Sequence, residues 1–280
     1  MNNFELYKLQ RAGLQNHQIL KVIHYAKMHK KSLSLRDVAV VSECRKPVLF
    51  MENYRSLDLL ALKKEFRKYP TISLLEEDYP EQLKEMYDPP VLLFYQGNKE
   101  LLKLPKIAVV GARDATKIGI QSVEKVIAGL EGKFVIVSGL AKGIDAAAHY
   151  ASIRNQTPTI AVIGTGLDIS YPKTNARLQE YIGKHGLILS EYGPGQGPHK
   201  FHFPARNRII AGLSMGVIVA EARIRSGSLI TCERAMEEGR EVFAIPGDIL
   251  SGHSAGCHSL IKEGAKCITS GLDVLSEYPF

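Results

Sequence analysis

Seven short apolar runs, separated by segments with helical periodicity, follow one another from Lys106 to the end of the chain. They are KIAVVGA, FVIVSG, TIAVIGT, LILSEY, GVIVAEA, EVFAIPG and KCIT. Most are apolar at consecutive rather than alternate positions, which is typical of strands buried on both faces of a parallel sheet. Because strands and helices alternate, the pattern predicts an α/β fold with an extended Rossmann-like, doubly wound and mostly parallel sheet.

Residues 4–68 have a different pattern, in which apolar residues recur at three- and four-residue steps. This periodicity predicts helices over residues 4–14, 16–29, 33–42 and 47–69. A stretch with four prolines and the extended run VLLFYQG then leads into the alternating segment. We therefore expect two domains, a small all-helical domain over residues 1–70 and the Rossmann-like domain over residues 71–280.

The composition, with 45% hydrophobic and 23% charged residues, is that of a soluble globular protein. No apolar run approaches the ~18 residues of a membrane span, and the N-terminus lacks the features of a signal peptide. We therefore expect a cytoplasmic protein without membrane contact. His253, Cys257, His258 and Cys267 lie close together, but their spacing fits no zinc finger or ribbon, so no metal is expected.

The charge is distributed unevenly. Residues 1–70 contain 14 Lys and Arg against 6 Asp and Glu, a net charge of +8, whereas the remainder has a net charge of −1. In the second part, basic residues gather in the segments that follow the predicted strands. The carboxyl ends of parallel strands share one edge of the sheet, where helix N-termini offer N–H groups to anions. That edge is predicted to be basic through Arg113, Lys117, Lys142, Lys173, Lys200, Arg206, Arg208, Arg223 and Arg225.

These strand ends do not match the common nucleotide-binding motifs. The GTG after one strand does not continue into GxGxxG, and GxxxxGK[ST] does not occur, so no nucleotide cofactor is expected. Several Gly and hydroxyl residues could instead cradle phosphates, although each glycine could equally serve a tight turn. The candidates are Ser138, Gly139, Gly164, Gly227, Ser228 and Thr231. Five acids lie at the same edge: Asp114, Asp145, Asp168, Glu191 and Glu221. They are interpreted as helix caps or as partners that orient the basic groups, and the alternative is a catalytic carboxylate.

The segment FPARNRIIAGLS, residues 203–214, places three polar groups before an apolar helix. Pro204 suits the first turn of a helix and would put Arg206, Asn207 and Arg208 at its positive end, where they would meet phosphates. Lys200 and Phe201 come just before this segment, and Phe203 is its first residue. The two aromatic rings could stack on unpaired bases, or alternatively belong to the core.

A set of motifs, in order and spacing, resembles the bacterial DNA-processing protein A family (DprA, also called Smf). The motifs are VVGAR, VSGLAKGIDAAAH, AVIGTGLDISYPKTN, HFPARNRIIAGLS and VIVAEARIRSGSLITCERAMEEGREVFAIPGD. The resemblance covers residues 71–275, and residues 1–68 look more like a sterile-alpha-motif bundle. It implies a non-enzymatic cytoplasmic protein of natural transformation that binds and protects incoming single-stranded DNA, loads the RecA recombinase onto it and forms a homodimer.

The resemblance also implies DNA contacts at the matching positions. These are Gly111, Arg113, Ser138, Gly139, Lys142, Gly143, Lys173, Arg206, Asn207, Arg208, Gly227, Ser228 and Thr231. A weaker alternative is a nucleoside-monophosphate phosphoribohydrolase, because related strand-end residues bind nucleotides in such enzymes. In that reading Glu221 or Glu233 would act together with Arg206.

Two further surfaces are expected from this resemblance. Leu260 and Ile261 lie beyond the main strand–helix repeats and are candidates for the dimer interface, or alternatively they close the sheet. On the predicted helix LITCERAMEEGRE, helical spacing puts Glu233, Met236, Glu237 and Arg240 on one face. That face is a candidate RecA contact, and the alternative is a solvated side of the helix.

Overall fold

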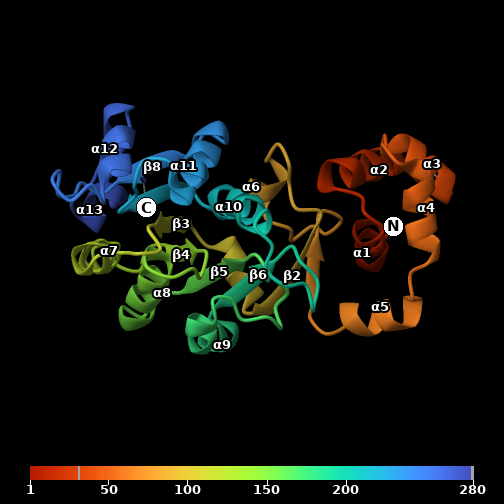
Figure 1. The fold of residues 1–280 in the computed structure, drawn as a ribbon, viewed down its shortest axis with the longest axis horizontal. Helices are drawn as coiled ribbons and strands as arrows, with labels where there is room; N and C mark the ends of the chain where they lie inside the picture. Colours follow the sequence, from red (N-terminus) through yellow and green to blue (C-terminus); the bar gives the residue numbers. More distant parts are fainter. Residues whose placement is uncertain (31, 279–280) are drawn as a thin grey trace. The chain divides into compact units, whose positions relative to one another are not determined.

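The structure of the chain is a computed structural model that describes residues 1–30 and 32–278. The backbone forms two compact units, Met1–Phe94 and Tyr95–Phe280 (Figure 1). No helix within the described ranges is long and apolar enough to cross a membrane.

The first unit is mainly helical. It contains α1 (Asn3–Arg11), α2 (Asn16–His29), α3 (Leu35–Val41), α4 (Pro47–Arg55), α5 (Leu59–Phe66) and the short α6 (Glu81–Lys84). The single helix expected over 47–69 is two helices, because Asp58 accepts hydrogen bonds from the N–H groups of Leu60 and Ala61 and starts a new helix. Leu6, Ile19, Val22, Phe50 and Leu62 are buried in this unit.

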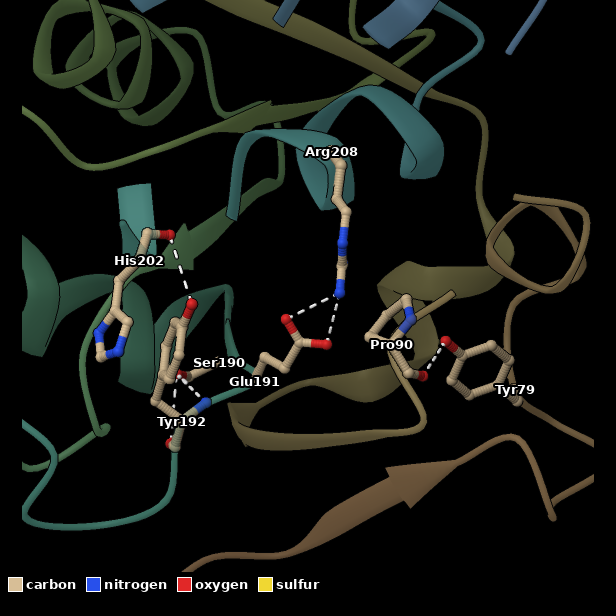
Figure 2. A network of polar contacts seen from close by, with 7 residues as sticks. All are labelled: Tyr79, Pro90, Ser190, Glu191, Tyr192, His202 and Arg208. Carbon is tan, nitrogen blue, oxygen red and sulfur yellow. Dashed lines mark hydrogen bonds and ion pairs between the residues drawn. The ribbon is translucent and has the colours of Figure 1, made fainter. Parts of the chain in front are cut away.

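The proline stretch contains the expected extended run VLLFYQG as a strand, and one further strand that the sequence pattern did not predict. Strand β1 (Thr71–Ser73) pairs antiparallel with β2 (Leu92–Gly97), with Ile72 opposite Leu93. The hydroxyl of Tyr79 donates to the carbonyl of Pro90 at 2.6 Å (Figure 2), which ties the intervening loop together.

The second unit confirms all seven predicted strands. They are β3 (Lys106–Gly111), β4 (Val135–Ser138), β5 (Thr159–Ile163), β6 (Leu187–Ser190), β7 (Gly216–Ala220), β8 (Glu241–Ala244) and β9 (Lys266–Cys267). They lie in the order β6-β5-β4-β3-β7-β8-β9, and every neighbouring pair is parallel. The order reverses between β3 and β7, so the switch point at which doubly wound sheets bind ligands lies at the carboxyl ends of these two strands.

Helices cover both faces of this sheet (Figure 1). Helices α7 (Lys117–Ala128) and α8 (Ile144–Arg154) pack together, as do α10 (His202–Leu213) and α11 (Gly227–Glu237). The hydrophobic core between α7, α8 and the strands includes Ile107, Val109, Val126, Phe134 and Ile136. The remaining helices are α9 (Ala176–His185), α12 (Ala255–Lys262), α13 (Gly271–Leu275) and the 3₁₀ segments η1 (Lys99–Lys103) and η2 (Lys173–Asn175).

Candidate nucleic-acid interface

Exposed basic side chains follow five neighbouring strands, β6, β5, β4, β3 and β7, at their carboxyl ends. Neighbouring strands are about 4.8 Å apart, so these loops form a continuous edge about 20 Å long. We call the exposed members the basic rim: Arg113, Lys117, Lys142, Lys173, Lys200, Arg223 and Arg225.

Aromatic rings lie among these cations. The guanidinium carbon of Arg113 lies 5.6 Å from the centre of the Phe203 ring, and the Tyr171 ring lies 5.4 Å from the same ring. Phe201 is 70% exposed, so the core alternative is wrong for this ring, and Phe203 is half-buried. Sequence reasoning missed Tyr171, although an aromatic residue two positions before Lys173 in a strand-end loop was an available signal. The rim thus offers rings for stacking next to charges for phosphates.

The start of α11 is the part of the rim that is best arranged for an anion. Its N-cap, Ser226, makes no side-chain capping bond, and a side chain at Gly227 would meet open space. The amide of Asn207 donates to the Gly227 carbonyl at 3.3 Å and holds this turn from α10. The side chains of Ser228 and Thr231 are buried, so at these two predicted positions only the backbone could reach a phosphate.

Four glycines of the predicted site, the phosphate-cradle candidates Gly139 and Gly164 and the predicted DNA contacts Gly111 and Gly143, make room for the protein itself. A side chain at Gly139 would collide with the Arg206 guanidinium, and one at Gly164 would press on the Phe203 ring. Gly143 has a φ of +73°, and an added Cβ there would strike the Ala112 carbonyl. A side chain at Gly111 would likewise strike the carbonyl of Ala220. The missing side chain at these four positions is thus explained by close packing within the chain, which was the alternative reading of such glycines.

Arg206 points into the unit and does not belong to the exposed rim. Its Nη1 donates to the Val162 carbonyl at 2.7 Å, and the residue is 4% exposed. Burial lowers the pKa of Arg206 and raises that of the buried Asp145, and the attraction between the two opposite charges counteracts both shifts. Ser138, also predicted to contact DNA, donates its hydroxyl to the Val109 carbonyl and is fully buried. Both residues build the support beneath the rim.

Arg208 is neutralised within the protein. Its Nη2 lies 2.7 and 2.9 Å from the two carboxylate oxygens of Glu191, and both side chains are nearly buried (Figure 2). The sequence predicts that Arg206 and Arg208 lie at the positive end of a helix that starts at Pro204. Helix α10 instead begins at His202, two residues earlier, so both arginines lie beyond its first turn. Tyr192 stacks on His202 with ring centres 3.6 Å apart and completes this support.

Glu221 fixes the loop that carries Arg113. Its carboxylate accepts from the N–H of Thr116 at 2.7 Å and also from the Thr116 hydroxyl, and its carbonyl accepts from the N–H of Ala112. The residue is buried and has a φ of +48°, a strained conformation for a non-glycine residue. Because Glu221 binds Thr116 while Arg206 binds Val162, the two residues have separate structural roles, which does not favour the phosphoribohydrolase alternative.

The other predicted surfaces are only partly formed. Glu233, Met236 and Glu237 are exposed on α11, but Arg240 lies after the helix end and Gly239, whose φ is +65°, so it does not extend their helical face. Leu260 is 6% exposed and packs in the core, so it is not available for a dimer contact. Ile261, the other candidate on α12, is half-buried. Across the described ranges, His, Cys, Asp and Glu side chains form no group of three that could hold a metal.

Two family models match the chain. Residues 70–279 match the model of DNA recombination-mediator protein A, and residues 1–62 match the DNA processing protein A sterile alpha motif domain. Two similar proteins are both called DNA processing protein DprA. The one from Streptococcus pneumoniae is 64% identical over 280 residues, 100% of this chain and 99% of the relative. The one from Bacillus subtilis is 47% identical over 211 residues, 75% of this chain and 71% of the relative.

Two solved structures are also similar. The X-ray structure of DNA processing protein A from Streptococcus pneumoniae matches with a TM-score of 0.98 and 64% identity, over 100% of this chain and 99% of that one. The structure of DNA processing protein A from Helicobacter pylori, described for its single-stranded DNA binding mode, matches with a TM-score of 0.68 and 32% identity, over 76% of this chain and 98% of that one.

Proposed function

The chain belongs to the DNA recombination-mediator protein A family, and from this premise we propose that it binds single-stranded DNA along the basic rim during natural transformation. The family is named for recombination mediation and DNA processing rather than for a catalysed reaction, which agrees with the expectation of a protein that is not an enzyme. The relative from Helicobacter pylori is described as a single-stranded DNA binder, which supports the same ligand here.

One observation carries the choice of ligand: Arg113 lies over the Phe203 ring, with Tyr171 against the same ring. A cation beside a pair of rings suits a phosphate followed by an unpaired base, which a duplex would keep stacked inside. The proposed contacts are therefore Arg113, Lys142, Lys173, Lys200 and Phe203, together with Arg223 and Arg225 of the predicted basic edge and the newly included Tyr171. Arg223 also pairs with Asp114 at 3.1 Å, but both side chains are largely exposed, so a phosphate could replace that weak partner.

We test this with Arg113→Ala and Lys173→Ala, measured against labelled oligothymidine at several salt concentrations. Each substitution should weaken binding and reduce the magnitude of the log–log salt slope by about 0.7, the value for one counterion released from a single strand. The matched control is Lys133→Ala, an exposed lysine in the loop before β4, at the opposite edge of the sheet. If Lys133→Ala weakens binding as much as Arg113→Ala, the effect is one of net charge and the rim is not the site.

The finer parts of the proposal concern partners. We infer that the chain acts in the cytoplasm, protects incoming DNA and loads a RecA-type recombinase, contacting it through Glu233, Met236 and Glu237 of α11. We also infer a homodimer that uses the α12 surface around Ile261. The exposure of the α11 residues and the partial exposure of Ile261 support these inferences.

A further inference from the structure

The net positive charge of the chain resides in residues 1–70, and helix α5 carries a concentrated part of it. Lys63 and Lys64 lie in the last turn of α5, and Arg67 is its C-cap, where the helix dipole favours cations. All three side chains are exposed. Across residues 1–30 and 32–278, no carboxylate forms an ion pair with any of these three cations.

The single acid within α5 does not offset this charge, because it belongs to another contact. Glu65 accepts a hydrogen bond from the Tyr7 hydroxyl and pairs with Arg11, both on α1. The carboxylate is therefore engaged with the neighbouring helix. The face of α5 that carries Lys63, Lys64 and Arg67 is left purely cationic.

Two hollows border these cations. The first, of about 330 Å³, is lined by Leu60, Lys63, Lys64, Arg67 and Lys68, which together we call the α5 surface. Leu60 is 84% exposed although it is apolar. The second hollow, of about 500 Å³, shares Lys63 and Arg67 with the first and has the rings of Phe4 and Phe66 in its wall. It also contains one acid, Glu76, whose carboxylate accepts hydrogen bonds from Asn3 and Ser73. Charged groups thus stand between two partly apolar depressions.

This arrangement distinguishes among polyanions. An acidic peptide or an anionic membrane would match the charge alone. A single nucleic-acid strand also repeats a phosphate next to a flat apolar base, so its phosphates can bind the cations while its bases enter the hollows beside Leu60 and Phe66. We propose that the α5 surface is a second site for single-stranded nucleic acid, separate from the basic rim.

The test uses the full chain with the rim weakened by Arg113→Ala and Lys173→Ala, so that residual binding of labelled oligothymidine reports on the second site. Adding Lys63→Ala, Lys64→Ala and Arg67→Ala should lower the residual affinity at low salt on the order of tenfold. The same three changes should reduce the magnitude of the salt slope by about 2, because three cations are lost. Circular dichroism melting confirms that each variant is folded.

The matched control removes three exposed cations of the same unit that lie away from the α5 surface, Arg36, Arg45 and Lys46, each changed to Ala. An equal loss in this control would overturn the proposal, because only total charge would then matter. It would also be overturned if the α5 changes spared oligothymidine and abolished binding to phosphatidylglycerol vesicles or to polyglutamate. If the rim substitutions alone leave binding unchanged, the function proposed for the rim is wrong. The three α5 substitutions are then made in the parent chain, and their effect on oligothymidine binding tests the α5 surface by itself.

Discussion

Lys106 shows how one residue can set a pH dependence for the whole fold. It is 1% exposed at the start of β3, and its Nζ donates to the carbonyls of Leu102 and Leu104 at 2.8 and 2.7 Å. Burial lowers its pKa from 10.5 to about 8. The unfolded chain therefore binds more protons than the folded one between these two values, so this lysine makes stability rise with pH across that window, by up to about 3 kcal/mol.

Lys106→Met should remove this rise. The measurement is denaturant unfolding of both proteins, under reducing conditions, from pH 7 to pH 10.5. We expect the difference in free energy of unfolding, parent minus Lys106→Met, to increase by about 3 kcal/mol as the pH rises from 8 to 10.5. Below pH 8 this difference should change little. Parallel curves for the two proteins would show that the buried ammonium does not control this dependence.

Individual side chains are also where prediction from the sequence failed most. Arg206 and Arg208 look like free cations in the sequence, yet one is buried against the Val162 carbonyl and the other is paired with Glu191. Their partners come from segments far away in the chain, so no local pattern reveals them. By contrast, Arg113 and Lys173 are exposed as expected, because their loops follow strands and no acid within residues 1–30 and 32–278 forms an ion pair with either one.

Helix α11 combines two expected roles along its length. Its first turn belongs to the edge of the sheet, and Glu233, Met236 and Glu237 are exposed further along the helix. Met236 is 48% exposed, and a flexible apolar side chain between charges is well suited to an adaptable protein contact. Met236→Ala with Glu233→Gln should therefore abolish capture of RecA in a pull-down and leave oligothymidine binding intact. If RecA capture is unchanged, this helix face is a solvated surface and not a RecA contact. If both RecA capture and DNA binding are lost, the variant is misfolded.

Strands and helices were predictable where the pattern is local and continuous. Strands β3 to β7 were found because each is a largely apolar run that is buried on both faces, and β8 is buried after its first residue. The two residues of β9 are only partly buried, and this strand was found from its place in the alternating pattern. The missed division between α4 and α5 had a local signal, since Asp58 is a typical N-cap before a helix. The start of α10 had no such signal: Phe201 makes no side-chain capping bond, and the helix begins where Tyr192 stacks on His202. Such a boundary depends on tertiary packing.

The assembled protein is expected to be a dimer, for a reason that lies in the order of the strands. Within the described part of the second unit, up to residue 278, β9 is the last strand in the order and has a strand neighbour on one side only. Exposed strand edges tend to pair unless they are covered, and a two-fold contact is the commonest way to cover one. Ile261 on α12 is half-buried, and α12 lies in the chain just before β9.

Ile261→Glu should give a folded monomer. In a two-fold dimer the introduced carboxylate would be buried next to the same carboxylate of the second chain, whereas in the monomer it stays hydrated. Light scattering gives the mass, and circular dichroism the fold. A dimer presents two basic rims to one strand, so the monomer should lose affinity for long oligothymidine, which can reach both rims, and keep its affinity for short oligothymidine. Leu260→Glu is the contrasting variant and should unfold the protein, since Leu260 is buried in the core. A dimeric Ile261→Glu protein with unchanged binding of long strands would place the interface elsewhere.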